Sequence, residues 1–142
     1  MARPGDGLDV YYFAYGANLS KRIMRERCPE AKPRFTVTLP NYRLAFVGWS
    51  RQWRGGVATV RPLHGEKVRG GLYELSEADW RRLDRFEGYP QDYTKVNVMV
   101  FDENGAAYQA VTYVKAGQTP ENPPSKEYLS VIGEGYRDWG IV

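Results

Sequence analysis

The stretch Tyr93–Phe101 alternates apolar and polar residues. Val96, Val98 and Val100 fall on one face of an extended chain with this pattern. A second apolar stretch, Ala107–Val114, follows after a short segment that contains an Asn-Gly pair. The pattern predicts an antiparallel β-hairpin, and its valine face must pack against other elements of a sheet or a helix layer.

Apolar runs between turn residues predict further strands earlier in the chain. They are Tyr11–Tyr15, Thr36–Leu39, Arg43–Gly48, Val57–Arg61 and Val68–Leu75. Two helices, Ser76–Glu87 and Ser125–Gly133, each open on a serine cap. The elements together predict an α+β fold, with a small, strongly curved, mixed or mostly antiparallel β-barrel and flanking helices.

The 142 residues are expected to form one domain, 1–142, with a flexible N-terminus at 1–10. The sequence has no signal peptide and no run of eighteen apolar residues, so we expect a soluble cytoplasmic protein without membrane partners. Cys28 is the single cysteine, and His64, the single histidine, lies in an expected exposed turn. One cysteine and one histidine argue against a zinc site, and we expect no metal or cofactor.

A net charge of +3 and a pI of about 9 raise the question of nucleic acid. Most of the charge is scattered over predicted helices, where solvated helix faces explain it. The segment Trp49–Arg54 interleaves tryptophans with arginines and could stack single-stranded bases. Nucleic-acid binding therefore stays open as an alternative.

The first predicted strand breaks at Gly16 and continues into a helix that reaches Cys28, with Asn18 or Ser20 as its cap. The first N–H groups of such a helix have no internal partner and attract a carboxylate or a phosphate. The junction is either this anion pocket or a plain structural turn, since both share the same pattern.

A carboxylate occupies an apolar position of the helix Ser76–Glu87. Trp80, Leu83 and Glu87 follow one another at helical spacing, so Glu87 continues the buried stripe just before the helix stop Gly88. Burial and the negative end of the helix dipole both raise the pKa of a carboxyl group, which suits proton transfer. The alternative is that the helix frays at Phe86 and that Glu87 turns to solvent.

Four motifs in order resemble the γ-glutamylcyclotransferases and γ-glutamylamine cyclotransferases. They are Tyr15-Gly16-Ala17-Asn18-Leu19, Gly55-Gly56-Val57-Ala58-Thr59-Val60, the acidic Leu83-Asp84-Arg85-Phe86-Glu87-Gly88 and Pro124-Ser125-Lys126-Glu127-Tyr128. Order and spacing agree from about Tyr12 to Ile141, which is nearly the whole chain.

The resemblance implies a barrel of six strands or a similar number, and an enzyme that needs no cofactor. Its partner is a small γ-glutamyl substrate, which cyclises to 5-oxoproline and releases an amine or amino acid, and the enzyme is a monomer or homodimer. The resemblance makes Glu87 the catalytic acid and base, and makes the loop a cradle for the glutamyl end. The substrate-binding residues it implies are Tyr15, Gly16, Ala17, Asn18, Leu19 and Tyr128.

Ala17 stands where the family usually has serine, which puts affinity or substrate choice in question while leaving the backbone amides in place. The identity of the leaving group stays open among amino acids, lysine-type isopeptides, amines and acylated antibiotics. We expect Trp49–Arg54 to line the side of the pocket that holds the leaving group. Tyr128 is either a pocket hydroxyl or a core residue. A catalytically silent binding module of the same fold is a further alternative.

Overall fold

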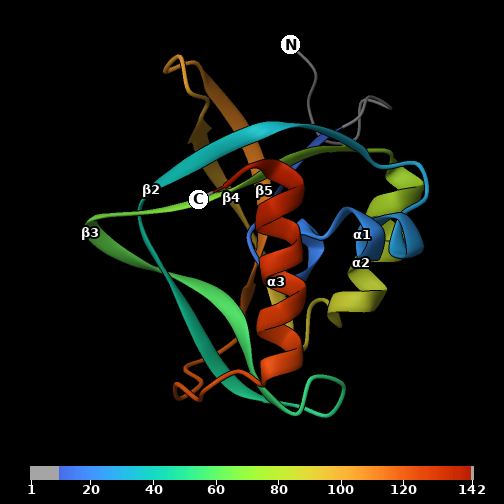
Figure 1. Cartoon of the computed structure of the whole chain (residues 1–142), viewed down its shortest axis with the longest axis vertical. Coiled ribbons are helices and arrows are strands. Elements are labelled where there is room, and N and C mark those ends of the chain that lie inside the picture. The colour runs from blue at the N-terminus through green and yellow to red at the C-terminus, as the bar shows by residue number, and fades with distance from the viewer. Residues whose placement is uncertain (1–9, 142) are drawn as a thin grey trace.

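The structure, a computed structural model, describes residues 10–141 (Figure 1). Its elements are, in chain order, β1 (Val10–Ala14), a 3-10 helix η1 (Ala17–Leu19), α1 (Lys21–Arg27), β2 (Lys32–Ser50), β3 (Gly55–Leu75), α2 (Glu77–Glu87), β4 (Tyr93–Phe101), β5 (Ala107–Lys115) and α3 (Lys126–Trp139). The single domain over 1–142 stays a prediction, and the expected flexible N-terminus, 1–10, lies outside the described residues except for Val10.

The strands close into a barrel in the order β1-β3-β2-β4-β5. The pair β1 and β5 runs parallel and closes the barrel, whereas the other neighbours are antiparallel. This mixed, mostly antiparallel barrel with flanking helices confirms the predicted fold class. Five strands form it in the described part of the chain, where the family resemblance implied about six.

The long hairpin of β2 and β3 replaces four predicted strands with two (Figure 1). Pro40 and Asn41 interrupt the apolar pattern, but the register shift between Pro40 and Tyr42 absorbs them as a bulge, with Asn41 at φ +64°. A bulge bends a strand without ending it, so β2 and β3 each continue past the interruption as one curved strand of the barrel. His64 is exposed as predicted, but it lies within β3 and not in a turn.

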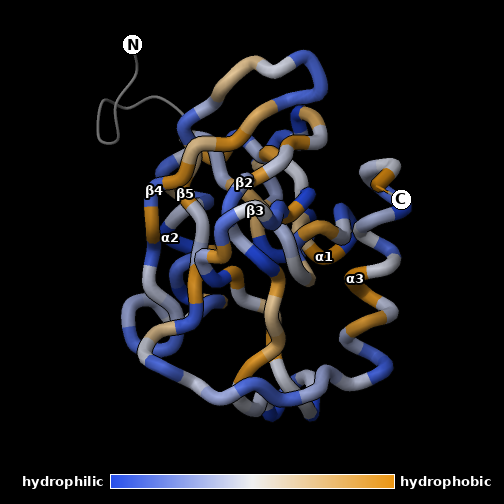
Figure 2. The backbone as a smooth tube through the Cα atoms, turned by 90° about the vertical axis from the view of Figure 1, so that its left-hand side faces the viewer, coloured by the Kyte–Doolittle hydropathy of each residue, from blue (hydrophilic) through white to orange (hydrophobic). Residues whose placement is uncertain are grey.

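The core has two parts, because β1 is buried on both faces. Phe13 and Tyr15 point into the barrel together with Val98 and Val100 of β4, which confirms the predicted apolar face of that strand. The other face of β1 packs outside the barrel, with Tyr12 against a cluster that includes Leu83 of α2. In Figure 2, α2 lies near β4 and β5 at the left of the view, and α1 lies near α3 at the right.

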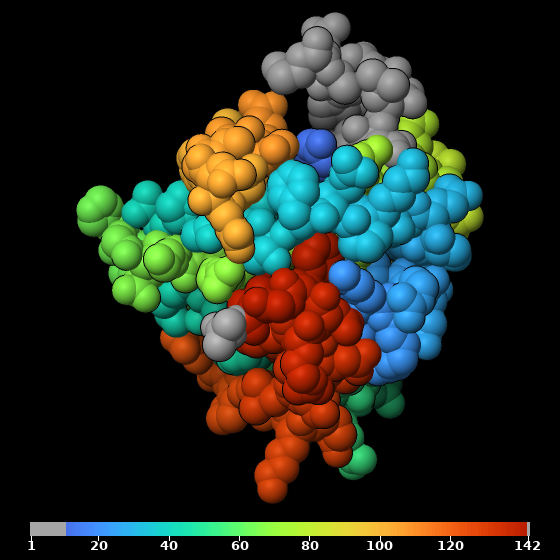
Figure 3. Space-filling view, turned by 45° about the horizontal axis from the view of Figure 1, so that its top comes forward, coloured from blue at the N-terminus to red at the C-terminus, as the bar shows by residue number. Residues whose placement is uncertain are grey.

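Helix α3 covers one side of the barrel and continues to Trp139, six residues beyond the predicted end at Gly133. Its glycines do not end it, because Gly135 packs against the η1 turn, where a Cβ atom would lie 2.4 Å from the Cβ of Leu19. The space-filling view shows α3 lying against the segment that contains α1 (Figure 3). Among residues 10–141, no helix is long and apolar enough to cross a membrane.

Candidate active site

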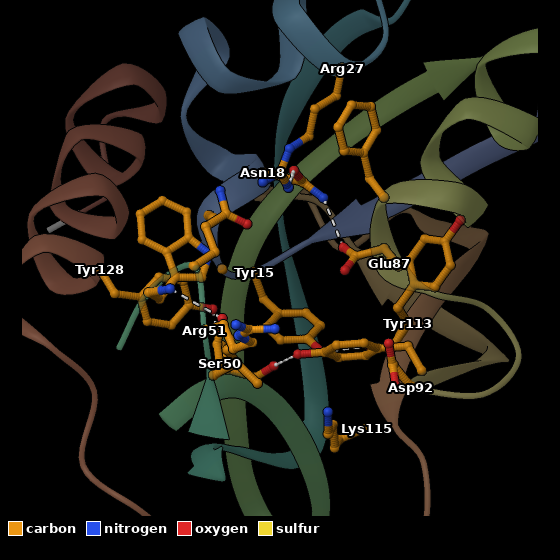
Figure 4. Close-up of a pocket in the computed structure, with 18 of the residues that line it drawn as sticks. Tyr15, Asn18, Arg27, Ser50, Arg51, Glu87, Asp92, Tyr113, Lys115 and Tyr128 are labelled. Carbon is orange, nitrogen blue, oxygen red and sulfur yellow. Dashed lines mark hydrogen bonds between the residues drawn. The ribbon is translucent and has the colours of Figure 1, made fainter. Parts of the chain in front are cut away.

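A cavity of about 300 Å³ lies at one end of the barrel (Figure 4). Its walls come from the loop after β1, the C-terminal ends of α1 and α2, the β2–β3 turn, the ends of β4 and β5, and α3. Residues far apart in the sequence therefore meet in one place.

The loop after β1 is built around Gly16, whose carbonyl accepts a hydrogen bond from the N–H of Leu19 at 3.0 Å. Ser20, and not Asn18, caps α1, since its hydroxyl accepts from the N–H of Ile23 at 3.2 Å. The η1 turn thus separates the loop from α1. Within residues 10–141, the N–H groups of Ala17 and Asn18 have no protein acceptor, and both residues line the cavity. The free donors of the predicted anion pocket belong to this turn and not to the helix.

The side chain of Asn18 is buried and fully hydrogen bonded. Its Nδ2 donates to the hydroxyl of Tyr12 at 2.9 Å and to Oε1 of Glu87 at 3.1 Å. Its Oδ1 accepts from Nη1 of Arg27 at 2.8 Å. The residue that was a candidate helix cap therefore links three side chains of the cavity wall.

Glu87 is the last residue of α2 and its side chain enters the cavity (Figure 4). Leu83 on the same stripe is fully buried, and α2 continues to Glu87 without fraying. Burial raises the pKa of Glu87, although Arg27, the bond from Asn18 and Lys115 lower this pKa in part. The position and the direction of the shift agree with the sequence argument.

Tyrosine side chains surround Glu87. The hydroxyl of Tyr128 accepts a hydrogen bond from the N–H of Ala58 at 2.9 Å, and its ring lies against that of Trp53, with centroids 5.0 Å apart. Tyr93 donates to the carbonyl of Ala58 at 3.0 Å. Burial raises the pKa of Tyr128 to about 12, so its phenol stays neutral at physiological pH. Tyr128 is both a core residue and a cavity residue.

The side of the cavity away from the loop carries two cations (Figure 4). Lys115 ends β5, and its Nζ lies 5.2 Å from the ring centroid of Tyr93. Arg51 lies in the β2–β3 turn, and within the segment Trp49–Arg54 residues 49–53 line the cavity and Arg54 does not. Neither cation forms an ion pair within the described chain. One carboxylate besides Glu87, that of Asp92, also lines the cavity.

The structure brings most of the residues that sequence reasoning selected into one cavity. They are Tyr15, Gly16, Ala17, Asn18, Glu87 and Tyr128. Leu19 does not line the cavity, because its side chain is fully buried in the second core region. Its carbonyl accepts from Nε1 of Trp139 at 2.8 Å, so Leu19 holds the loop against α3.

Sequence reasoning attributed the charges of the predicted helices, Arg27 among them, to solvated helix faces, and it overlooked Lys115. The position of Arg27, three residues after buried Met24, was the available signal, because residues at this spacing share a helix face. Lys115 carried no such signal. Among residues 10–141, no cluster of three or more metal-ligating side chains occurs.

The model of the family described as "Gamma-glutamyl cyclotransferase, AIG2-like" matches residues 12–135. This chain belongs to that family. Its resemblance to γ-glutamylcyclotransferases is thereby confirmed, and the cavity of this family member is lined by a buried carboxylate, that of Glu87.

Relatives and solved structures agree with the family. The chain is 30% identical to the γ-glutamylcyclotransferase of Bos taurus over 98% of this chain and 76% of the relative. It is 28% identical to the γ-glutamylcyclotransferase of Homo sapiens over 92% of this chain and 71% of the relative. A solved structure of a γ-glutamyl cyclotransferase matches with a TM-score of 0.90 and 27% identity, covering 94% of this chain and 81% of that one. These likenesses indicate an enzyme of the cyclotransferase type.

Proposed function

We propose that this chain is a γ-glutamyl cyclotransferase in which Glu87 is the general acid and base. The observation that carries the proposal is the Glu87 carboxylate in the cavity wall, linked through Asn18 to the loop with free N–H groups. The product is 5-oxoproline, and the second product is the amine or amino acid that leaves.

The reaction moves two protons, one after the other, from the α-ammonium nitrogen to the leaving nitrogen. Ionised Glu87 takes a proton from the α-ammonium group of the substrate, and the free amine attacks the γ-carbonyl carbon to form a new C–N bond. The bond from that carbon to the leaving nitrogen then breaks, and protonated Glu87 returns the proton to this nitrogen. Glu87 next takes the second proton that the attacking nitrogen must lose to become the lactam N–H of 5-oxoproline, and passes it to the departing amine, which leaves as an ammonium group. Atoms and charges balance without water or an added cofactor.

The raised pKa of Glu87 favours the first proton transfer. An α-ammonium group with a pKa of about 7.7–8.0 and an ordinary glutamate at about 4.3 differ by roughly 3–4 units, which is about 5 kcal/mol of uphill transfer. Burial reduces this difference, because it raises the pKa of Glu87. The tyrosines around Glu87 keep water away from it while staying neutral.

In this proposal, the α-carboxylate of the glutamyl group binds at the N–H groups of Ala17 and Asn18, since free backbone donors suit an anion. Ala17 in place of serine leaves these donors intact. The leaving group then extends toward Lys115 and Arg51, whose charges suit a carboxylate on the leaving amine. Among the leaving groups that the sequence left open, amino acids fit this side of the cavity best.

The other two interpretations have less support. Trp53 lies against Tyr128 inside the cavity wall, so it is not free to stack a nucleic-acid base. A silent binding module would not need a carboxylate whose pKa burial raises, since such a group costs stability. The proposed enzyme works in the cytoplasm as a monomer or homodimer.

The test is release of 5-oxoproline from γ-glutamyl compounds by the wild type and by Glu87→Gln. We expect wild-type turnover in the presence of a chelator and a fall in kcat of about 10²–10⁴-fold in the variant. Glu77→Gln, an exposed position in the first turn of the same helix, is the matched control and should keep wild-type kcat. A folded Glu87→Gln protein within a few-fold of wild-type kcat would remove Glu87 from the mechanism.

A further inference from the structure

Arg27 touches the wall of the cavity at two points. Its Nη1 donates to Oδ1 of Asn18 at 2.8 Å, and its guanidinium carbon lies 5.3 Å from the ring centroid of Phe86. Phe86 precedes Glu87 on α2 and is mostly exposed. Arg27 therefore contacts both the partner and the neighbour of the proposed acid and base, from the last position of α1.

Arg27 does not reach Glu87 as an ion pair, since no such pair occurs within residues 10–141. It acts through the amide of Asn18. An arginine side chain only donates hydrogen bonds, so the amide must turn its oxygen to Arg27 and its NH₂ group to Glu87. With the amide reversed, its oxygen would face the ionised carboxylate of Glu87 and repel it.

We propose that Arg27 is a positioning residue, which fixes the amide of Asn18 so that its NH₂ group holds Glu87 in the orientation for proton transfer. The proposal rests on the proposed function of Glu87. A direct ion pair would hold Glu87 ionised and oppose the return of its proton. The link through a neutral amide orients the carboxylate while allowing it to gain and lose a proton.

The contact with the ring of Phe86 gives Arg27 a second way to position Glu87. A cation over an aromatic ring is attracted by the electrons of the ring face, and the contact ties the end of α2 to the end of α1. Phe86 and Glu87 are consecutive, so this contact limits movement of the backbone that carries the carboxylate. Both contacts of Arg27 therefore act on the position of one side chain.

Several other groups face Glu87 and bear on its titration. The cation besides Arg27 is Lys115 on β5, and the neutral phenols are Tyr12 and Tyr15 from β1 and its loop, Tyr93 on β4, Tyr113 on β5 and Tyr128 on α3. The carboxylate of Asp92 also lines the cavity. Loss of the Arg27 charge raises the pKa of Tyr12 and of Tyr128 further, because this charge lowers both, so the two phenols stay neutral in the variants.

The experiment compares Arg27→Met and Arg27→Lys with Arg25→Met, which removes an exposed arginine from the same helix and is the matched control. We expect Arg27→Met to lower kcat about 10-fold to 100-fold, because misplacement of a catalytic group by about 1 Å can cost that much. KM should stay within about 3-fold. The acid limb of the kcat/KM profile should move to higher pH, since loss of the cation and of the fixed NH₂ donor raises the pKa of Glu87.

Arg27→Lys keeps a positive charge and a donor, so it should recover part of the lost kcat and return the acid limb toward the wild-type pH. A second readout needs no turnover. In the substrate-free protein, the carboxyl carbon of Glu87 should titrate at higher pH in Arg27→Met than in the wild type, as followed by NMR. This measurement tests Arg27 even where Glu87→Gln stays active and the proposed function fails.

Two results would overturn the proposal. In the first, Arg27→Met behaves like Arg25→Met, with the same kcat and the same Glu87 titration. In the second, the loss falls on KM while both titrations stay at the wild-type pH, which would make Arg27 a substrate-binding residue.

Discussion

Replacing Lys115 by methionine tests which end of the substrate this residue meets. Two substrates that differ in one group make the comparison: γ-glutamyl-alanine has a carboxylate on its leaving amine, and γ-glutamyl-ethylamine has the same carbon skeleton without it. We expect the wild type to prefer the first substrate and Lys115→Met to lose most of that preference. Methionine keeps the approximate length and the apolar stem of lysine and removes the ammonium group that lies over the ring of Tyr93.

The expected loss of substrate preference follows from the position of Lys115. Two unit charges 4 Å apart interact by about 4 kcal/mol at an effective dielectric of 20 and by about 1 kcal/mol in water. Lys115 is partly exposed at the cavity wall, which places its interaction in the lower part of this range, at about 1–2 kcal/mol. The preference for γ-glutamyl-alanine should therefore fall about 5-fold to 30-fold.

The assay is kcat/KM for release of 5-oxoproline from each substrate, and the quantity of interest is the ratio of the two values. The ratio matters because Lys115 also lowers the pKa of Glu87, and its loss alters turnover of both substrates through that pKa. Lys126→Met, at an exposed position at the start of α3, is the control and should leave the ratio unchanged. An unchanged ratio in Lys115→Met would refute the placement of the leaving group.

Three further predictions concern the loop, Glu87 and Tyr128. Ala17→Pro removes one free N–H and should raise KM at least 10-fold, while Ala17→Ser stays near wild type; equal KM values for all three proteins would exclude the loop as the cradle. Burial raises the pKa of Glu87 above its value of about 4.3 in the unfolded protein. Between the two pKa values the folded protein therefore binds more protons than the unfolded protein. The contribution of Glu87 to the free energy of unfolding is highest below about pH 4.3 and falls as pH rises through the folded pKa. Glu87→Gln should therefore have a higher free energy of unfolding than wild type at pH 7 in denaturant titrations and lose that advantage near pH 4, and an advantage independent of pH would contradict this reasoning. Tyr128→Phe leaves the N–H of Ala58 without its acceptor and should lower the free energy of unfolding by about 1–3 kcal/mol. A denaturant unfolding curve with an unchanged midpoint and slope would show that this hydrogen bond adds nothing to stability.

Local patterns in the sequence were enough to predict where Glu87 lies. The spacing of Trp80, Leu83 and Glu87 depends only on helical geometry, and the stop at Gly88 fixes the end of the helix, where Gly88 adopts the left-handed conformation at φ +67°. The same holds for the buried valines of β4. Features that depend only on the residue spacing within one helix or strand were therefore predictable.

Features that depend on contacts between elements were not predictable from these patterns. Lys115 comes to the cavity through closure of the barrel, which no periodicity within β5 encodes. Arg27 looked like other arginines of α1, and its role depends on Asn18 having its side chain in the cavity wall and not on a helix cap. The length of α3 was missed because Gly135 is selected by close packing against Leu19, although glycine by itself weakens a helix.

The parallel seam between β1 and β5 has a consequence for how enzymes of this shape can diversify. Parallel strands end at the same rim, so the loop that follows β1 and Lys115 at the end of β5 are neighbours across one cavity although about a hundred positions separate them in the chain. The seam pairs Tyr12 with Val111, whereas Lys115 pairs with Tyr93 of β4 on the other side of β5. Replacement of the β5 residue therefore changes the charge that faces the proposed leaving amine and also the pKa of Glu87, while the loop after β1 and the carboxylate on α2 keep their places in the chain, so one position can tune substrate choice and proton transfer together.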